Sequence, residues 1–150
     1  MLDTKRTGFT LIEMLMVIVV IGALLGVALP YFRTSTSKSA ARGAGDAITS
    51  LNALARATAI ERGRQASLVL ATGSNSAVVV ANRVTSTGVD TVGKVEDLYE
   101  RFGVTVRTTR DTLKFSPRGI GLWTSTVTIV VSKGGFSDTL LASTGGRMTR

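Results

Sequence analysis

The sequence predicts an α+β fold in which a long N-terminal helix packs on a mostly antiparallel β domain. An apolar run holding one acidic residue comes first, an amphipathic helical pattern follows, and short β-rich runs separated by turn residues fill the rest of the 150 residues. These patterns divide the chain into a basic leader at 1–8, a membrane-spanning helix at 9–30, its amphipathic continuation at 31–63 and a β-rich globular domain at 64–150.

The apolar run from Phe9 to Leu29 is long enough to span a membrane. At a rise of about 1.5 Å per residue, a helix of this length covers the roughly 30 Å hydrocarbon core. Glu13 is its single charged residue, and a carboxylate at the centre of such a helix costs about 3 kcal/mol. The many Leu, Ile, Val and Phe side chains offset that penalty. An ionisable group in this setting still needs a partner, so Glu13 indicates a functional site.

Three further residues of this segment bear on helix packing. Gly22 and Gly26 form a Gly-x-x-x-Gly face that lets helices approach closely. Pro30 lacks a backbone N–H group and predicts a kink or local melting at the end of the spanning segment.

Two simpler explanations of this segment compete with a functional role for Glu13. Lys5 and Arg6 with the small residues Gly26-Val27-Ala28 would suit a secretory signal peptide, but the apolar run is too long and holds Glu13. A plain membrane anchor would treat Glu13 as accidental. Neither explanation accounts for Gly8, which directly precedes the apolar run.

The string Gly8-Phe9-Thr10-Leu11-Ile12-Glu13 resembles the N-terminal signature of type IV pilins and pseudopilins. The resemblance implies that a prepilin peptidase cleaves after Gly8, removes the leader Met1–Gly8 and methylates Phe9. It also implies that Glu13 meets the positive N-terminal amine of a neighbouring subunit as helices stack into a filament. Because a carboxylate in low dielectric is costly unless paired, this contact would favour one axial register among the packed helices.

The segment 31–63 carries small apolar residues at steps of three or four, which is typical of an amphipathic helix that packs on a sheet. Gly43 and Gly45 predict a looser start, a firmer helix from about Asp46 and an end at Gly63. The polar residues expected mostly on other faces are Arg42, Asp46, Asn52, Arg56 and Arg62.

The second half of the chain is expected to be mostly β-structure. The predicted strands are Ser67–Ala71, Ala77–Ala81, Val104–Arg107, Thr112–Phe115, Trp123–Ser132, Thr139–Ala142 and Arg147–Thr149. The first two form a hairpin across Gly73-Ser74-Asn75. The stretch Ser86–Lys94 is expected to be a surface loop that leads into a short helix at Val95–Phe102.

Three strings in this region resemble the GspH/FimT branch of minor pseudopilins and minor pilins: Leu51–Gly63, Phe115–Gly119 and Gly145–Arg147. The resemblance implies a structural subunit at or near the tip of a type II secretion pseudopilus or a type IV pilus. Its partners would be other pilins, bound through the N-terminal helix, and the prepilin peptidase. The chain would cross the inner membrane once, with a cytoplasmic leader and a periplasmic globular domain; flanking charges alone do not fix that orientation.

Composition and motifs argue against catalysis. The chain has no Cys and no His, which excludes disulfides, thiol chemistry, the usual zinc sites and His-dependent triads. The Ser35-x-x-Lys38 string lacks its companion motifs, and Gly119–Thr124 misses the third glycine of a dinucleotide loop. The acidic residues between Asp90 and Glu100 are more typical of a solvated loop than of a cation site. We expect no enzyme activity, no cofactor and no metal.

Lys and Arg outnumber Asp and Glu by 18 to 10, giving a formal net charge of +8. Such an excess favours contact with DNA or anionic lipid, although a surface that is merely basic explains it equally well. FimT-like minor pilins of natural competence bind DNA through arginines near the C-terminus, and here that resemblance points to Arg147 and Arg150, helped by Arg118 and Lys133, as phosphate contacts. The Gly146-Arg147-Met148-Thr149-Arg150 spacing departs from the Gly-Arg-x-Arg form of those proteins.

Three functional classes follow from the sequence. A structural filament subunit ranks first and a DNA-binding minor pilin second. A membrane-tethered periplasmic enzyme ranks a distant third.

Overall fold

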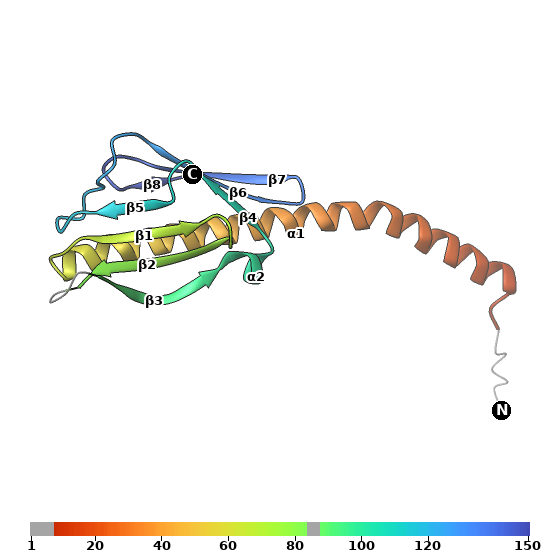
Figure 1. Ribbon diagram of the computed structural model, residues 1–150. Coiled ribbons are helices and arrows are strands. Elements are labelled where there is room, and N and C mark those ends of the chain that lie inside the picture. Colours follow the sequence, from red (N-terminus) through yellow and green to blue (C-terminus); the bar gives the residue numbers. More distant parts are fainter. Residues whose placement is uncertain (1–7, 84–87) are drawn as a thin grey trace, which may run out of the picture. The chain divides into compact units, whose positions relative to one another are not determined.

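The structure is a computed structural model that describes residues 8–83 and 88–150. It comprises two compact units, Met1–Ser35 and Thr36–Arg150, which are described separately. Helix α1, Leu11–Glu61, contributes residues to both units (Figure 1). The leader residues 1–7 lie outside the described residues, so Gly8 is the one residue of the expected leader that the structure describes.

In the first unit, α1 is continuous through Pro30. The local melting expected there is therefore not observed, whereas a kink stays a prediction. The hydroxyl of Thr34 donates to the carbonyl of Pro30 at 3.1 Å, one turn later in the helix. A helix interior tolerates one missing N–H donor when the surrounding turns keep their hydrogen bonds.

In the second unit, the rest of α1 packs on two β-sheets. Its buried residues are mostly small and recur at steps of three or four: Ala41, Ala44, Gly45, Ile48, Asn52, Ala55, Thr58 and Ala59. Small side chains let sheets approach the helix closely. Gly63 ends the helix as expected, with φ +58° and hydrogen bonds from Gly63 N to Ile60 O and from Arg64 N to Ala59 O.

Each sheet has four antiparallel strands. The first has the order β3-β2-β1-β5 and the second the order β4-β6-β7-β8. The strands are β1 Ala66–Ala71, β2 Ser76–Asn82, β3 Val89–Asp97, β4 Thr105–Thr108, β5 Thr112–Phe115, β6 Val127–Lys133, β7 Phe136–Ala142 and β8 Met148–Thr149, with the short helix α2 Leu98–Phe102 between β3 and β4. The α+β class and the long helix packed on an antiparallel β domain are thus confirmed.

One apolar core joins α1 to both sheets. Its fully buried large side chains include Phe115 and Leu113 from the first sheet and Ile129 and Leu140 from the second. Trp123 lies edge-on to Phe115, with ring centroids 5.3 Å apart. The core lies entirely within residues 40–148, so it is complete without the apolar N-terminal segment.

Some expectations for this unit were wrong. The predicted helix Val95–Phe102 begins only at Leu98, because Val95–Asp97 belong to β3, and the predicted strand Trp123–Ser132 begins only at Val127. The stretch expected to be a surface loop up to Lys94 contains strand β3, which begins at Val89 and runs along the free edge of its sheet. An edge strand needs little apolar burial, so the mixed Thr, Gly and Val composition of this stretch did not predict a strand. Residues 86–87, the earlier part of the stretch, lie outside the described residues. The loose helix start is also absent, since α1 is regular through Gly43 and Gly45.

Gly43 and Gly45 serve close packing instead. A Cβ on Gly43 would lie 3.0 Å from the ring of Phe102, and one on Gly45 would lie 2.9 Å from side-chain atoms of both Arg150 and Asp138. The helix therefore accepts the conformational cost of two glycines because neighbouring side chains occupy the space of a Cβ.

Candidate functional site

The first candidate site is the exposed apolar part of α1 in the first unit. Phe9 is 73% exposed, and the large apolar residues from Leu11 to Leu29 are all exposed. Within the described residues this helix is long and apolar enough to cross a membrane. An exposed apolar surface of this size is typical of a segment that binds lipid or another protein.

Glu13 lies in the first turn of this helix. The Glu13 N–H donates to the hydroxyl of Thr10 at 3.3 Å, and the Thr10 N–H donates to Oε2 of Glu13 at 3.5 Å. This reciprocal pair is a capping box, which satisfies two of the backbone donors left free at a helix start. The carboxylate is therefore held beside the N-terminal end of the helix and the residue that precedes it, Phe9.

Gly22 and Gly26 leave an open strip on the same helix. A Cβ placed on either glycine would meet no described atom within 4 Å. Neither glycine is therefore required by packing within the described part of the chain. A second helix can therefore approach closely along this face.

The four basic residues expected to contact DNA are spread along the second unit rather than gathered. We call the end holding α1 residues 36–46 the near end and the end holding residues 56–61 the far end. Lys133 lies at the near end, where its Nζ donates to Phe102 O and the adjacent Gly134 faces Ser37. Arg118 lies at the far end, because the next residue, Gly119, packs on Ile60 of α1.

Arg150 is bound within the chain. Its Nη2 lies 3.0 Å from Oδ1 of Asp46 and 3.1 Å from the carbonyl oxygen of Arg42, and its Nε lies 2.9 Å from Oδ2 of Asp138. The carboxylate of Asp138 is buried, so the guanidinium neutralises a charge inside the fold. These contacts reduce the donors that Arg150 has left for an external phosphate.

Arg147 is exposed and comes directly after Gly146, whose carbonyl accepts a hydrogen bond of 3.2 Å from the amide of Asn52. Asn52 was expected on an exposed face, but it is buried. Sequence periodicity did not predict the burial of Asn52, because a polar side chain in a helix is assigned to the exposed face unless its hydrogen-bond partner is known. Arg147 therefore lies close to Asn52 of α1, between Arg150, which contacts Asp46, and Arg118 at the far end.

Charge is unevenly distributed between the two ends of the second unit. The basic residues at or close to the far end are Arg56, Arg62, Arg64, Arg83, Lys114 and Arg118, whereas the acidic ones there are Glu61 and Asp90. Arg83 is paired with Asp90 at 2.6 Å. Arg56 was not singled out from the sequence; the contact of its side chain with the Gly119 turn reveals it.

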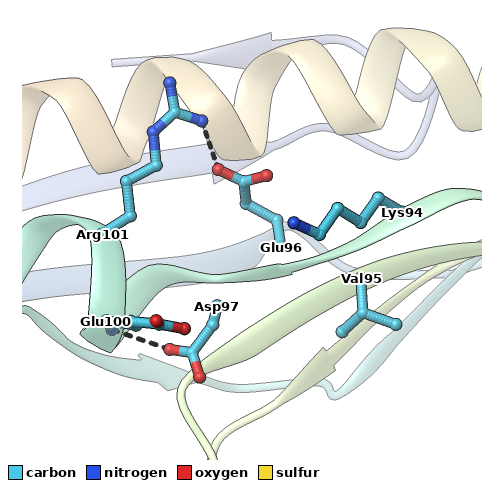
Figure 2. Close-up of a pocket in the computed structure, with 6 residues that line it drawn as sticks. All are labelled: Lys94, Val95, Glu96, Asp97, Glu100 and Arg101. Atoms are coloured by element: carbon cyan, nitrogen blue, oxygen red, sulfur yellow. Dashed lines mark hydrogen bonds and ion pairs between the residues drawn. The ribbon is translucent and has the colours of Figure 1, made fainter.

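The near end has a more acidic corner where β3 meets α2. An open hollow of about 420 Å³ is lined there by Lys94, Val95, Glu96, Asp97, Glu100 and Arg101. Figure 2 shows Glu96 and Arg101 on the side facing α1, where they form an ion pair, and Val95, Asp97 and Glu100 on the opposite side. Asp97 caps α2 by accepting the Glu100 N–H at 2.8 Å. Within the described residues, no three potential metal-ligating side chains are grouped.

Comparisons with known proteins bear on both units. The prokaryotic N-terminal methylation motif matches residues 3–29, and the type II transport protein GspH family matches residues 44–146. The chain belongs to the GspH family. It is therefore a pilin or pseudopilin of the GspH type, a class of filament subunits of type IV pili or type II secretion systems. Members of this class are structural subunits.

The GspH-type fold is also found in solved structures. Two crystal structures of the type IV minor pilin FimU from Pseudomonas aeruginosa PAO1 resemble this chain, with TM-scores of 0.59 and 0.56 and sequence identities of 15% and 16%. The first match covers 73% of this chain and 86% of FimU, and the second covers 72% and 90%. At these identities the likeness shows the fold alone. None of the curated proteins compared with the chain matches it.

Proposed function

We propose that this GspH-type protein is a minor structural subunit at or near the tip of a type II secretion pseudopilus or a type IV pilus. The observation that carries the proposal is the contrast between its two units. The second unit buries a complete core, whereas the apolar helix of the first unit is exposed along its whole length. Such a helix is stable when lipid surrounds it and again when neighbouring helices replace the lipid in a filament.

The proposed maturation starts at the N-terminus. A prepilin peptidase would cleave between Gly8 and Phe9, remove the leader 1–8 and methylate the new amine of Phe9. Segment 9–30 would then span the inner membrane from a cytoplasmic start, and 31–63 with 64–150 would lie in the periplasm. The match to the N-terminal methylation motif and the exposure of Gly8 and Phe9 support cleavage and methylation at this position.

Glu13 would then pair with the N-terminal amine of an adjacent subunit. The capping box holds its carboxylate at the helix start, where the amine of Phe9 would also lie after cleavage. A charge pair in low dielectric contributes specificity of register more than net stability, because desolvation offsets much of the attraction. Gly22, Gly26 and Pro30 would shape the helix packing around this register.

Mass spectrometry of the protein purified from membranes tests this maturation. We expect a chain that begins at Phe9 and carries one N-terminal methyl group. A Gly8→Leu variant should keep its leader because the bulky side chain obstructs cleavage, while a Thr7→Ser control should be processed normally. A mature chain that begins after Ala28 would contradict the proposal and support a secretory signal peptide.

A DNA-binding minor pilin is the second candidate function, and the basic far end is the observation that favours it. Arg118 and Arg147 remain the best phosphate contacts among the four expected residues, and Arg56 and Lys114 extend their basic surface. Arg150 would act mainly through its contacts with Asp46 and Asp138.

A filter-binding titration of the full chain in detergent with duplex DNA tests this second function. We expect an affinity that falls as the salt concentration rises. An Arg118→Gln, Arg147→Gln double variant should make the negative slope of log K against log salt shallower by about two, because two phosphate contacts are lost. A Lys133→Gln variant is the control, because Lys133 lies at the other end of the unit. Unchanged affinity in the double variant, or no salt-dependent binding by the parent chain, would exclude the proposal.

A further inference from the structure

A small open hollow lies at the near end of the second unit, beside the turn between β6 and β7. It has a volume of about 300 Å³ and is lined by Gly103, Thr105, Ser132, Lys133, Gly134 and Gly135. A Cβ on Gly134 would lie 2.7 Å from the hydroxyl of Ser37, so the turn rests on the part of α1 with which this unit begins (Figure 1). The hollow therefore lies where the chain enters the unit from the apolar segment.

The hollow presents hydrogen-bond donors and a positive charge. The ammonium group of Lys133 donates to Phe102 O, which leaves two of its three hydrogens for another acceptor. The Thr105 hydroxyl lies 3.0 Å from the Ser132 hydroxyl and 3.4 Å from the Ser132 carbonyl oxygen. When Thr105 donates to either atom, the Ser132 hydroxyl keeps its own hydrogen for a ligand. Donors gathered around one cation in this way suit the oxygens of a phosphate group.

Two further cations lie close to the hollow on α1. Lys38 directly follows Ser37, and Arg42 lies one turn later on the same face of the helix. Both side chains are exposed. Among the described residues, Lys38, Arg42 and Lys133 form no ion pair. Three uncompensated positive charges are thus available at this end of the unit.

The carboxylates of the near end do not cancel these charges. Asp46, Asp138 and Glu96 are each paired with an arginine of the same unit. Asp97 and Glu100 lie on the side of β3 that is turned away from α1 (Figure 2). An anion that approaches the hollow therefore meets cations that no carboxylate has neutralised.

The chain connects the hollow to the proposed membrane-spanning segment by a short path. α1 runs without a break from Leu29 to Ser37, and at about 1.5 Å per residue this stretch of helix is roughly 12 Å long. The headgroup layer on each side of the hydrocarbon core is about 5–8 Å thick. Tyr31 and Phe32 follow the apolar run and are 81% and 68% exposed, as aromatic residues are at membrane interfaces. Headgroups are thus the phosphates that the chain itself brings close to the hollow.

We propose that the hollow binds the phosphate group of an anionic phospholipid, with Lys133 and the Ser132 hydroxyl donating to its oxygens. Lys38 and Arg42 would lie beside neighbouring headgroups. This inference rests on the proposed function, because it requires segment 9–30 to span a membrane. The spanning helix holds the site next to headgroups at a high effective concentration, which no free phosphate shares. The contact also gives a role to cations that flanking-charge rules would place in the cytoplasm.

Native mass spectrometry of the full chain tests the site, with the protein released from a neutral detergent that contains phosphatidylglycerol. We expect each chain to retain one phosphatidylglycerol. Lys133→Gln should lower the affinity about fivefold, which is the loss expected for one cation at an anionic surface. Lys133→Arg should keep the affinity because it keeps the charge. Lys114→Gln is the matched control, since Lys114 is exposed and lies close to the far end.

A second variant guards against a structural effect of Lys133→Gln, which also alters the contact with Phe102. Lys38→Gln changes an exposed residue of α1 and should lower the affinity by a similar factor. The fluorescence of Trp123 reports whether each variant is folded. Unchanged affinity in both variants would overturn the proposal.

Competition identifies the source of the phosphate. Inorganic phosphate or glycerol 3-phosphate in hundredfold excess should not displace the lipid, and phosphatidylcholine, which has no net charge, should bind at least tenfold more weakly. Displacement by either free anion would assign the hollow to a soluble phosphate, and equal binding of phosphatidylcholine would mean that the cations contribute nothing. Loss of DNA affinity in the Lys133→Gln chain would assign the hollow to DNA. Each of these results would overturn the proposal.

Reconstitution into phosphatidylglycerol vesicles separates this inference from the proposed function. A chain that resists carbonate extraction, but whose lipid affinity does not depend on Lys133 or Lys38, would refute only the headgroup contact. A chain that carbonate removes from the vesicles would instead argue against the spanning segment and hence against the proposed function.

Discussion

The guanidinium of Arg150 lies 2.9 Å from the buried carboxylate of Asp138. Through this contact the segment after β8 is tied to β7, and a second contact with Asp46 ties it to α1. The three elements come from distant parts of the chain. Arg150 therefore ties the C-terminal segment to the second unit, although the resemblance to FimT-like minor pilins pointed to it as a contact for DNA.

Replacing Arg150 with Leu should destabilise the second unit by about 1–3 kcal/mol, because it leaves the buried Asp138 carboxylate without a cation. The loss is limited because Arg150 is itself partly exposed and solvent screens its interactions. Urea unfolding of the full chain in detergent, followed through the fluorescence of the single Trp123, measures the loss.

The control for this prediction is Arg147→Leu, which removes an exposed arginine from the same end of the chain. It should change the free energy of unfolding by less than about 0.5 kcal/mol. Equal effects of the two substitutions would mean that the Asp138 contact contributes nothing specific.

Gly45→Ala should destabilise the second unit by about 1–3 kcal/mol even though Ala is the better helix former. The new Cβ would lie 2.9 Å from both Arg150 Nη2 and Asp138 Oδ2, so the ion pair must move. Gly22→Ala is the helical control, because no described atom lies within 4 Å of the added group. A Gly45→Ala chain that is more stable than the parent would refute this account of the glycine.

Asn75 is expected to be sensitive to substitution because it joins both sheets. It has φ +51°, its side-chain oxygen accepts the Val106 N–H at 2.8 Å, and its carbonyl accepts the Leu98 N–H at 3.0 Å. Asn75→Ala should lower the free energy of unfolding by about 2–3 kcal/mol through backbone strain and a lost hydrogen bond.

Two further variants at this position separate those causes. Asn75→Gly relieves the strain but lacks the acceptor, and Asn75→Asp keeps the acceptor. Both should be more stable than Asn75→Ala in the same urea titration. If Asn75→Ala had the same free energy of unfolding as the parent chain, neither backbone strain nor the lost hydrogen bond would explain the role of Asn75.

Glu13→Gln should reduce filament incorporation at least tenfold while the chain still inserts and is processed. The amide keeps an oxygen that can accept the Thr10 N–H but carries no charge for a neighbouring amine. Immunoblots of sheared filaments and of membranes measure the two pools. Thr10→Val is the control for the capping box alone, and an equal loss in that variant would assign Glu13 a role in helix capping rather than in assembly.

The local patterns of the chain were sufficient to predict most of its elements. The long helix, its end at Gly63, the hairpin of β1 and β2 and the strand Thr112–Phe115 all follow from periodicity and turn residues, which act over a few positions. Strand β3 was missed because an exposed edge strand lacks the apolar alternation on which such predictions depend.

The candidate sites divide in the same way. The sequence by itself determined the Gly8, Phe9 and Glu13 signature and the apolar helix, because their chemistry depends on adjacent residues. Only the tertiary structure decided that Arg150 neutralises Asp138, that Asn52 is buried against Gly146 and that Arg56 joins Arg118 at the far end. Each of these contacts joins residues far apart in the chain, and their meeting is set by how the two sheets pack on α1.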